Sequence, residues 1–155
     1  MKSLFKKSVI YILILFFYFL PSLLFKVDKE FYNNLKGAFV PPLAFIIIWS
    51  VIFLFLAFEH SYYIFSYRKY NKKELIHYFI VVGINYLFIF IFPIVFFVAH
   101  NPFLGYIVTM MTAMTAILIS MQSLLLSKKL TLCSLPLVLW SIFATVYSIL
   151  LYLKN

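Results

Sequence analysis

Long uninterrupted runs of apolar residues, separated by short polar segments, dominate the chain. The first run, residues 8–25, contains no charged residue over 18 positions. A helix needs about 20 apolar residues to cross a bilayer, whereas a strand of a transmembrane barrel alternates apolar and polar residues over about ten. The unbroken runs therefore predict helices, whose backbone groups are all hydrogen-bonded within the span. Five spans are expected, at residues 8–25, 42–67, 75–99, 103–127 and 132–153.

The connection between the first two spans, residues 26–41, is the only long one. It is rich in Lys, Asp, Glu and Asn, and loops longer than about 12–15 residues are often lids or binding loops. Pro41-Pro42 ends the loop. We expect the second span to begin near Pro42, because a proline at the start of a helix costs no hydrogen bond. The pattern thus predicts an all-α integral membrane protein, a bundle of five transmembrane helices that forms a single domain over residues 1–155.

The composition supports this fold class. Hydrophobic residues make up 66% of the chain and charged residues 11%, against about 45–50% and about 25% in soluble domains. The mean hydropathy is +1.07. A soluble fold of this size cannot cover so much apolar surface with so few charges. A soluble enzyme, a disordered tail and a coiled coil are therefore excluded.

Basic residues are distributed unequally between the two sides of a five-span chain. Nine lie in the N-terminal segment and the second and fourth connections, and four lie in the first loop and at the C-terminal end. Because cytoplasmic segments carry the excess of Lys and Arg, we expect the N-terminus inside and the first loop and C-terminus outside.

This asymmetry accounts for the net charge of +9, so no nucleic-acid partner is expected. The first span has the basic start of a signal peptide, but its long apolar core predicts a retained helix.

Two features of the spans concern packing. Small residues in span four recur at helical spacing, which places them on one face: Gly105, Thr109, Ala113, Ala116 and Ser120. Such a face lets transmembrane helices approach closely, either within the bundle or across a dimer seam. Asn85 lies deep in span three and needs a partner, so we expect an interhelical hydrogen bond.

Both tryptophans lie deeper than the interfacial belt where tryptophan usually sits. Trp49 is about 10 Å inside the start of its helix at 1.5 Å per residue, and Trp140 is near the middle of span five. A buried indole N–H needs a partner, so the pair indicates either a cavity with a polar ligand or structural filling. Trp140 shares a face with Pro136, Phe143 and Tyr147, a stripe that suits either a packed core or the wall of a site for a flat ligand.

Ionisable residues within the spans are few. Glu59 and His60 lie within about two turns of the end of span two, where we expect them to anchor the helix at the interface; a proton relay is the alternative. His77 is similarly shallow. No metal-ligand spacing and no nucleophile–base pair is present, so no metal site and no hydrolytic chemistry is expected. A lone Cys133 cannot form an intramolecular disulfide.

Three groups of residues carry a family resemblance. The first loop reads Phe31-Tyr32-x-x-Leu35-Lys36 and Phe39-x-Pro41-Pro42, with Trp49 in the next helix. Span three contains Asn85-Tyr86-Leu87-Phe88, Phe92-Pro93 and Phe96-Phe97, and span five contains Pro136, Trp140 and Phe143-Ala144-Thr145. In this order the motifs resemble the TspO/MBR family, the tryptophan-rich sensory or translocator proteins, over the whole chain.

The chain departs from the family pattern at several positions. Phe31 and Phe39 stand where tryptophan is usual, and Gly37 stands where proline is usual. Three polar positions of the family pocket are also changed: Ile89 and Ser148 replace asparagine, and Val108 replaces aspartate. These changes bear on the ligand preference rather than on the fold.

The resemblance implies a membrane receptor or sensor, often a homodimer, that binds tetrapyrroles such as protoporphyrin IX and haem. It also implies a bacterial cell membrane and, for bacterial members, light-dependent porphyrin breakdown in which pocket tryptophans take part. Trp49 and Trp140 would be the photochemical residues, with porphyrin as ligand or substrate and no other cofactor required. We expect the ligand beneath the first loop, against Tyr32, Phe39, Pro42, Trp49, Phe92, Trp140, Phe143, Ala144 and Tyr147.

Two other classes of protein remain open. A transport subunit for an apolar metabolite or sterol-like lipid would show a helix broken at mid-membrane, for which Pro93 is the candidate. A purely structural membrane partner would bind no porphyrin.

Overall fold

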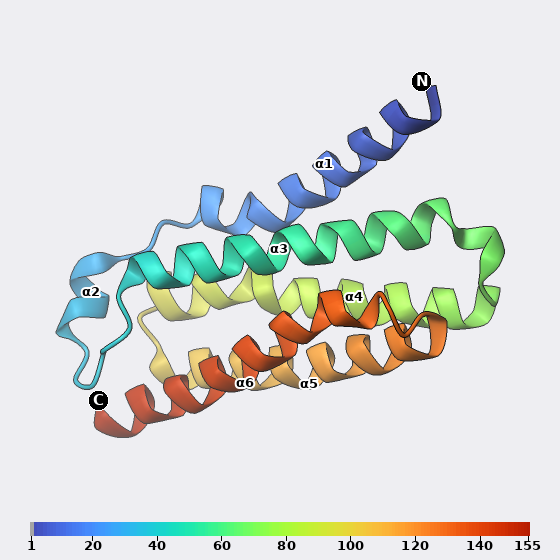
Figure 1. Cartoon of the computed structure of the whole chain (residues 1–155). Coiled ribbons are helices and arrows are strands. Elements are labelled where there is room, and N and C mark those ends of the chain that lie inside the picture. Colours follow the sequence, from blue (N-terminus) through green and yellow to red (C-terminus); the bar gives the residue numbers. More distant parts are fainter. Residues whose placement is uncertain (1) are drawn as a thin grey trace.

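The computed structural model describes residues 2–155, which form helices joined by short connections (Figure 1). Five helices are long: α1 (Lys2–Leu24), α3 (Pro42–Phe65), α4 (Lys72–Pro93), α5 (Pro102–Leu126) and α6 (Thr131–Lys154). Three are short: α2 (Lys29–Asn34), the 3₁₀ turn η1 (Tyr67–Lys69) and the π-helical η2 (Ile94–Val98). The expected five-helix membrane bundle is confirmed, because each long helix is long and apolar enough to cross a bilayer.

Polar caps and prolines decide where the helices begin. Asn71 accepts a hydrogen bond from the N–H of Lys73 at 2.9 Å and starts α4, and Asn101 accepts one from Leu104 at 3.0 Å and starts α5. Such caps satisfy N–H groups that have no partner within the helix. As a result, α4 begins at Lys72, three residues before the predicted apolar span, since its first turn is polar but capped.

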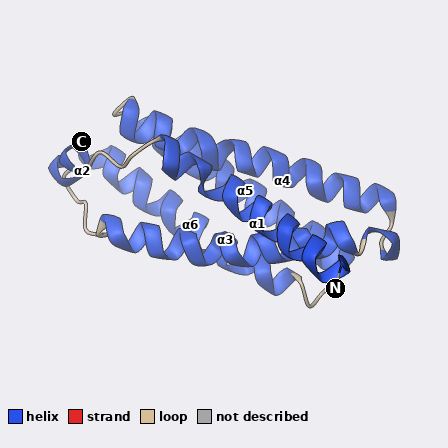
Figure 2. Ribbon diagram, turned by 90° about the horizontal axis from the view of Figure 1, so that it is seen from above, coloured by secondary structure: helices blue, strands red, loops and turns tan. Residues whose placement is uncertain are grey.

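The long helices pack in a ring. Contacts join α1 to α3, α3 to α6, α6 to α5, α5 to α4, and α4 back to α1. Figure 2 shows these helices running side by side, with α2 at the end away from the N-terminus. Toward its N-terminus α1 leaves the bundle obliquely (Figure 1), and Phe5 is 71% exposed there.

The small-residue face of α5 lies inside this ring. Gly105, Thr109, Ala113 and Ala116 are buried and Ser120 is half-buried, so the face serves packing within the bundle. Gly105 has a specific reason to lack a side chain, because a Cβ atom there would overlap the ring of Phe96 on η2.

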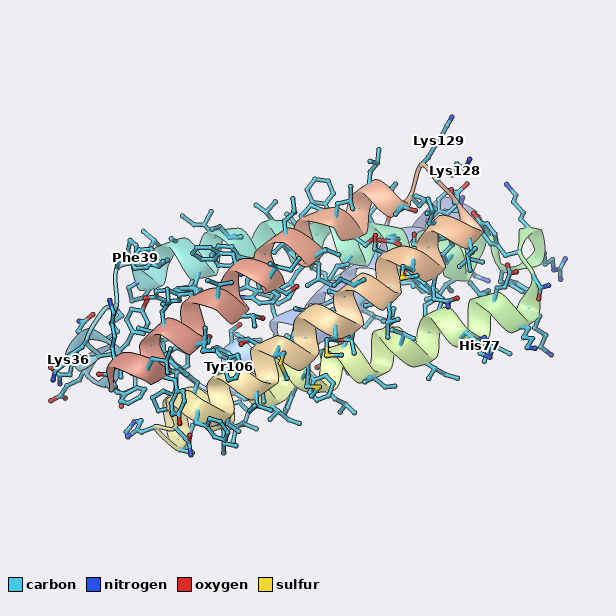
Figure 3. All side chains as sticks on the ribbon, turned by 90° about the horizontal axis from the view of Figure 1, so that it is seen from below. Lys36, Phe39, His77, Tyr106, Lys128 and Lys129 are labelled. Atoms are coloured by element: carbon cyan, nitrogen blue, oxygen red, sulfur yellow. The ribbon has the colours of Figure 1, made fainter. Side chains whose placement is uncertain are left out.

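The two ends of the bundle carry different segments. The N-terminus and the α3–α4 and α5–α6 connections lie at one end, while α2 and the C-terminus lie at the other (Figure 1). Lys128 and Lys129 accordingly lie far from Lys36 and Phe39 (Figure 3). The two groups of basic segments therefore lie at opposite ends of the bundle, as a five-span chain requires. That the end with the N-terminus faces the cytoplasm stays a prediction.

Candidate functional site

A cavity of about 220 Å³ lies within the ring, in the half of the bundle next to α2. Its walls come from all five long helices, the first loop and η2, and no charged side chain lines it. Aromatic rings dominate the walls: Tyr18, Phe19, Phe25, Tyr32, Phe45, Trp49, Phe53, Phe92, Phe96, Phe97 and Tyr147. An apolar space walled by aromatic rings suits a flat apolar ligand that stacks on ring faces.

Six of the nine residues expected to contact a ligand line this cavity: Tyr32, Pro42, Trp49, Phe92, Ala144 and Tyr147. The structure does not bring the other three into the walls. Phe39 is 68% exposed on the loop (Figure 3), Phe143 is 37% exposed, and Trp140 lies behind the wall. Of the changed family positions, Ile89 and Ser148 line the cavity, whereas Val108 does not.

The first loop covers the end of the cavity next to α2 through two tyrosines. The hydroxyls of Tyr147 on α6 and Tyr32 on α2 lie 2.6 Å apart, and Tyr32 donates to the carbonyl of Val40 at 2.6 Å. The N–H of Phe39 donates to the Tyr147 hydroxyl at 3.2 Å. Burial, reinforced by the Tyr147 hydroxyl, raises the pKa of Tyr32 above its ordinary value. Tyr32 thus keeps its proton for this network.

Two further contacts hold the loop at its ends. Near its start, Asp28 lies 3.0 Å from Nε2 of His100, and the ring of Phe31 stacks on His100 at 4.4 Å. The hydrogen bond from the N–H of Phe31 to Asp28, with a smaller contribution from His100, lowers the pKa of Asp28. At the other end, Asn155 donates to the carbonyl of Lys36 at 3.1 Å and accepts from its N–H at 2.9 Å.

The two tryptophans occupy different positions relative to the cavity. Trp49 lines it and packs on Phe53 with ring centres 5.4 Å apart. Trp140 stacks on Phe143 at 5.0 Å and meets the edge of Phe45 at 5.5 Å, and Phe45 itself lines the cavity. The buried Nε1 of Trp140 has no hydrogen-bond partner. Trp140 is therefore separated from the cavity by one ring.

Sequence reasoning missed Phe45, although the pattern held a signal for it. Pro42, Phe45 and Trp49 follow each other at spacings of three and four residues, which places them on one helical face. All three line the cavity.

The expected interfacial anchoring of Glu59 and His60 is wrong. Both side chains are buried in the bundle, at 0% and 2% exposure, because their face of α3 turns into the ring. His60 bonds the hydroxyls of Tyr18 and Tyr78, each at 2.8 Å. His77, in contrast, is exposed on α4 (Figure 3).

The predicted interhelical hydrogen bond of Asn85 is confirmed. Its Nδ2 donates to Oγ1 of Thr115 at 2.7 Å and to the carbonyl of Thr112 at 3.1 Å. Both partners lie on α5, so this residue ties α4 to α5 beside the cavity.

Comparison with protein families decides the relationship. The model of the TspO/MBR family matches residues 9–153. The chain belongs to the TspO/MBR family. A search of curated proteins finds no match to it. This TspO/MBR member is accordingly an integral membrane protein of a sensor and receptor family, and the first loop, η2 and the cavity all fall within the matched residues.

Proposed function

We propose that this TspO/MBR protein binds a tetrapyrrole, protoporphyrin IX or haem, in the cavity beneath its first loop. The observation that carries the proposal is the apolar cavity itself, with Trp49, Phe92 and Tyr147 among its aromatic walls and the first loop held over it by the contact of Tyr32 with Tyr147. Offset stacking on such rings contributes about 0.5–1.5 kcal/mol per pair beyond area burial.

The size of the cavity bears on how a tetrapyrrole binds. Sites for drug-sized ligands usually enclose roughly 300–1,000 Å³, and this cavity encloses about 220 Å³. The walls must therefore move apart for a macrocycle to fit. We propose that the first loop lifts, which breaks the contacts of Tyr147 with Tyr32 and Phe39. Because no charged side chain lines the cavity, the propionates of a porphyrin would remain at its outer, water-facing mouth.

We propose further that light drives breakdown of the bound porphyrin. The porphyrin and oxygen supply the reactive chemistry, and the protein supplies orientation and a dry site. Trp49 would contact the macrocycle and supply or relay an electron. Trp140 would act one ring farther away, through Phe45.

The test is the absorbance of purified protein with protoporphyrin IX, in the dark and under illumination, for wild type and the variants Trp49→Phe and Trp140→Phe. Phenylalanine keeps a ring but removes the indole and its easier oxidation. We expect Trp49→Phe to weaken dark binding by about 1 kcal/mol, since it alone lies at the wall, and both variants to slow bleaching. A variant that carries both substitutions is measured as well. Bleaching of bound porphyrin at equal rates by wild type and this double variant would eliminate the tryptophan mechanism.

Transport of an apolar metabolite is supported less well. Within residues 2–155, the helix that is interrupted is the third span, where Pro93 is followed by the π-helical η2. This interruption lies at the outer end of the span and against the cavity, rather than at mid-membrane as in transporters with broken helices. π-Helical turns are frequent at binding sites, so η2 fits a receptor.

A homodimer is proposed on the family resemblance alone, and cross-linking in membranes would test it.

A further inference from the structure

A second group of polar side chains lies buried in the other half of the bundle. Glu59 is ten residues beyond Trp49 on α3, about 15 Å at 1.5 Å per residue. Every long helix contributes to the group: Tyr18 from α1, Glu59, His60 and Tyr63 from α3, Tyr78 from α4, Ser123 from α5 and Thr131 from α6. Buried polar groups in a membrane are costly and usually functional.

The carboxyl of Glu59 is the unusual member of this group. Solvent reaches neither oxygen, and neither has a hydrogen-bond partner with good geometry. The hydroxyls of Ser123 and Tyr78 are the polar groups against it. Glu59 forms no ion pair with any residue in the described part of the chain. The ion pair found there joins Asp28 to His100, at the far end of the bundle.

Two series of hydrogen bonds begin at the hydroxyls that lie against this carboxyl, those of Tyr78 and Ser123. Toward the cavity, Tyr78 bonds Nδ1 of His60 at 2.8 Å, and Nε2 of His60 bonds Tyr18 at 2.8 Å. Tyr18 lines the inner end of the cavity and stacks on Phe53 with ring centres 5.0 Å apart. A ligand that fills the inner end of the cavity would therefore press on a ring that is bonded to His60.

The second series leads to the α5–α6 connection. Ser123 bonds the hydroxyl of Tyr63 at 2.8 Å, and Oγ1 of Thr131 lies 3.5 Å from Oγ of Ser123. Thr131 in turn donates to the carbonyl of Ser127 at 3.0 Å, next to the exposed Lys128. These hydroxyls lie between Glu59 and the end of the bundle that carries the basic residues.

We propose that Glu59 is a proton-binding site, neutral in the ligand-free protein, whose proton is coupled to the cavity through Tyr78, His60 and Tyr18. A proton is the occupant that this packing admits. A water molecule has no space at either oxygen, and the described residues contain no cluster of His, Cys, Asp or Glu side chains that could hold a metal ion. An ionised carboxylate here would be a buried charge without a counter-ion.

The coupling follows from the order of the hydrogen bonds. When Glu59 gives up its proton to Tyr78, Tyr78 passes its own to Nδ1 of His60, which leaves a carboxylate and an imidazolium and balances the charge. The arrangement of these protons depends on the bond between Nε2 of His60 and Tyr18, so a ligand that displaces Tyr18 changes how tightly the pair of Glu59 and His60 holds its proton. When that proton leaves to solvent along the hydroxyls of Ser123 and Thr131, ligand binding releases one proton, and by reciprocity pH then changes the affinity for the ligand.

The other titratable groups facing this site are few. Tyr63 lies on the same helix, Cys133 of α6 lies within electrostatic range of Glu59, and Tyr70 packs on Tyr63 at 5.2 Å. None is a cation, so the proton is exchanged between Glu59, His60 and solvent. The coupling rests on the proposed ligand function of the cavity, whereas the proton site does not.

Infrared spectroscopy tests the proton site. Wild type labelled with ¹³C at the glutamate carboxyls should show, near neutral pH, a protonated-acid C=O band that shifts with the label. The band should be absent in Glu59→Gln and present in Glu74→Gln, a control that removes a carboxyl from the first turn of α4. No label-sensitive acid band in wild type, or the same band in Glu59→Gln, would overturn the proton site. The labelled wild type decides the matter even if the variant fails to fold.

Dark titrations with protoporphyrin IX over about two pH units around neutrality test the coupling. One coupled proton changes the wild-type Kd by up to about tenfold per pH unit relative to Glu59→Gln, which corrects for the propionates of the porphyrin itself. Tyr78→Phe should keep the infrared band and lose this excess pH dependence, while Tyr62→Phe, exposed on α3, should keep both. Equal pH dependence in wild type and Glu59→Gln would overturn the coupling. Absence of saturable binding in wild type would overturn the proposed function and the coupling together, with the infrared band deciding the proton site separately.

Discussion

The hydroxyl of Tyr147 is the contact through which the hold on the loop can be weakened without removing a ring from the cavity walls. Tyr147→Phe retains the ring, which lies 4.9 Å from Phe39 and 6.0 Å from Phe45 between ring centres. It removes the 2.6 Å hydrogen bond to Tyr32 and leaves the N–H groups of Phe39 and Val40 without their acceptor, which lies at 3.2 and 3.5 Å. The bond from Tyr32 to the carbonyl of Val40 stays.

The expected magnitude follows from the two shorter of these three bonds, those with Tyr32 and Phe39. Each contributes about 0.5–1.5 kcal/mol net, so the closed loop loses about 1–3 kcal/mol. Since about 1.4 kcal/mol corresponds to a factor of ten in an equilibrium constant, the population with an open loop should rise roughly 5- to 150-fold. If the loop must lift to admit the ligand, the association rate should rise in the same sense.

Amide hydrogen exchange of residues 29–40 in detergent, together with stopped-flow association of protoporphyrin IX, measures both quantities. Tyr152→Phe is the matched control, because this residue lies on the same helix and is 42% exposed. Unchanged exchange in Tyr147→Phe would refute the idea that this hydroxyl holds the loop. Faster exchange with an unchanged association rate would instead refute gating by the loop.

Three further outcomes test other parts of the structure. Gly105→Ala should destabilise the bundle by about 1–3 kcal/mol through overpacking against Phe96, whereas Gly83→Ala, which meets open space, should leave the melting temperature equal or higher. The pKa of Asp28 in the folded protein lies below its ordinary value of 3.8, so its stabilisation of α2 as a cap is present above that pH and is lost as the pH falls through the lowered value. Hydrogen exchange of the α2 amides should therefore become faster at that low pH in wild type. An Asp28→Asn variant with the same acid response would disprove this role. In a Cys133→Ser background, impermeant thiol reagents should modify Asn33→Cys from outside and Asn71→Cys only after permeabilisation, and the reverse pattern would invert the topology.

The helices could be predicted from the sequence because a bilayer imposes a simple requirement on length and polarity. Each apolar run became one long helix, and Pro42 begins α3 where the pattern placed it. The ends were less predictable, since capped polar residues such as Lys72 extend a helix beyond its apolar run. Hydropathy reports where the membrane is, whereas capping decides where the helix begins.

The rotation of each helix could not be predicted in the same way. α3 is apolar on nearly every side, so its sequence does not distinguish the face toward lipid from the face toward the bundle. Glu59 therefore suggested a shallow interfacial position, while the structure turns it inward among side chains from the other long helices. Trp140 shows the same difficulty, because its depth was predictable but its separation from the cavity by Phe45 was not.

The loop illustrates a middle case. Its length indicated a lid or a binding loop, and the family resemblance implied that Tyr32 contacts a ligand. The contact that fastens it, between Tyr32 and Tyr147, joins residues 115 positions apart. No local pattern encodes such a pair, which depends on how α6 packs against α3 in the ring.

The most direct test of the account is fluorescence titration with protoporphyrin IX in the dark, using the two tryptophans as separate reporters. The chain has two tryptophans, so Trp140→Phe leaves only Trp49 at the cavity wall and Trp49→Phe leaves only Trp140 behind it. If the cavity binds the tetrapyrrole, both variants should show saturable quenching, with the midpoint of Trp49→Phe weaker by about 1 kcal/mol. Quenching that rises linearly without saturation in both variants, as for porphyrin dissolved in detergent, would contradict the account.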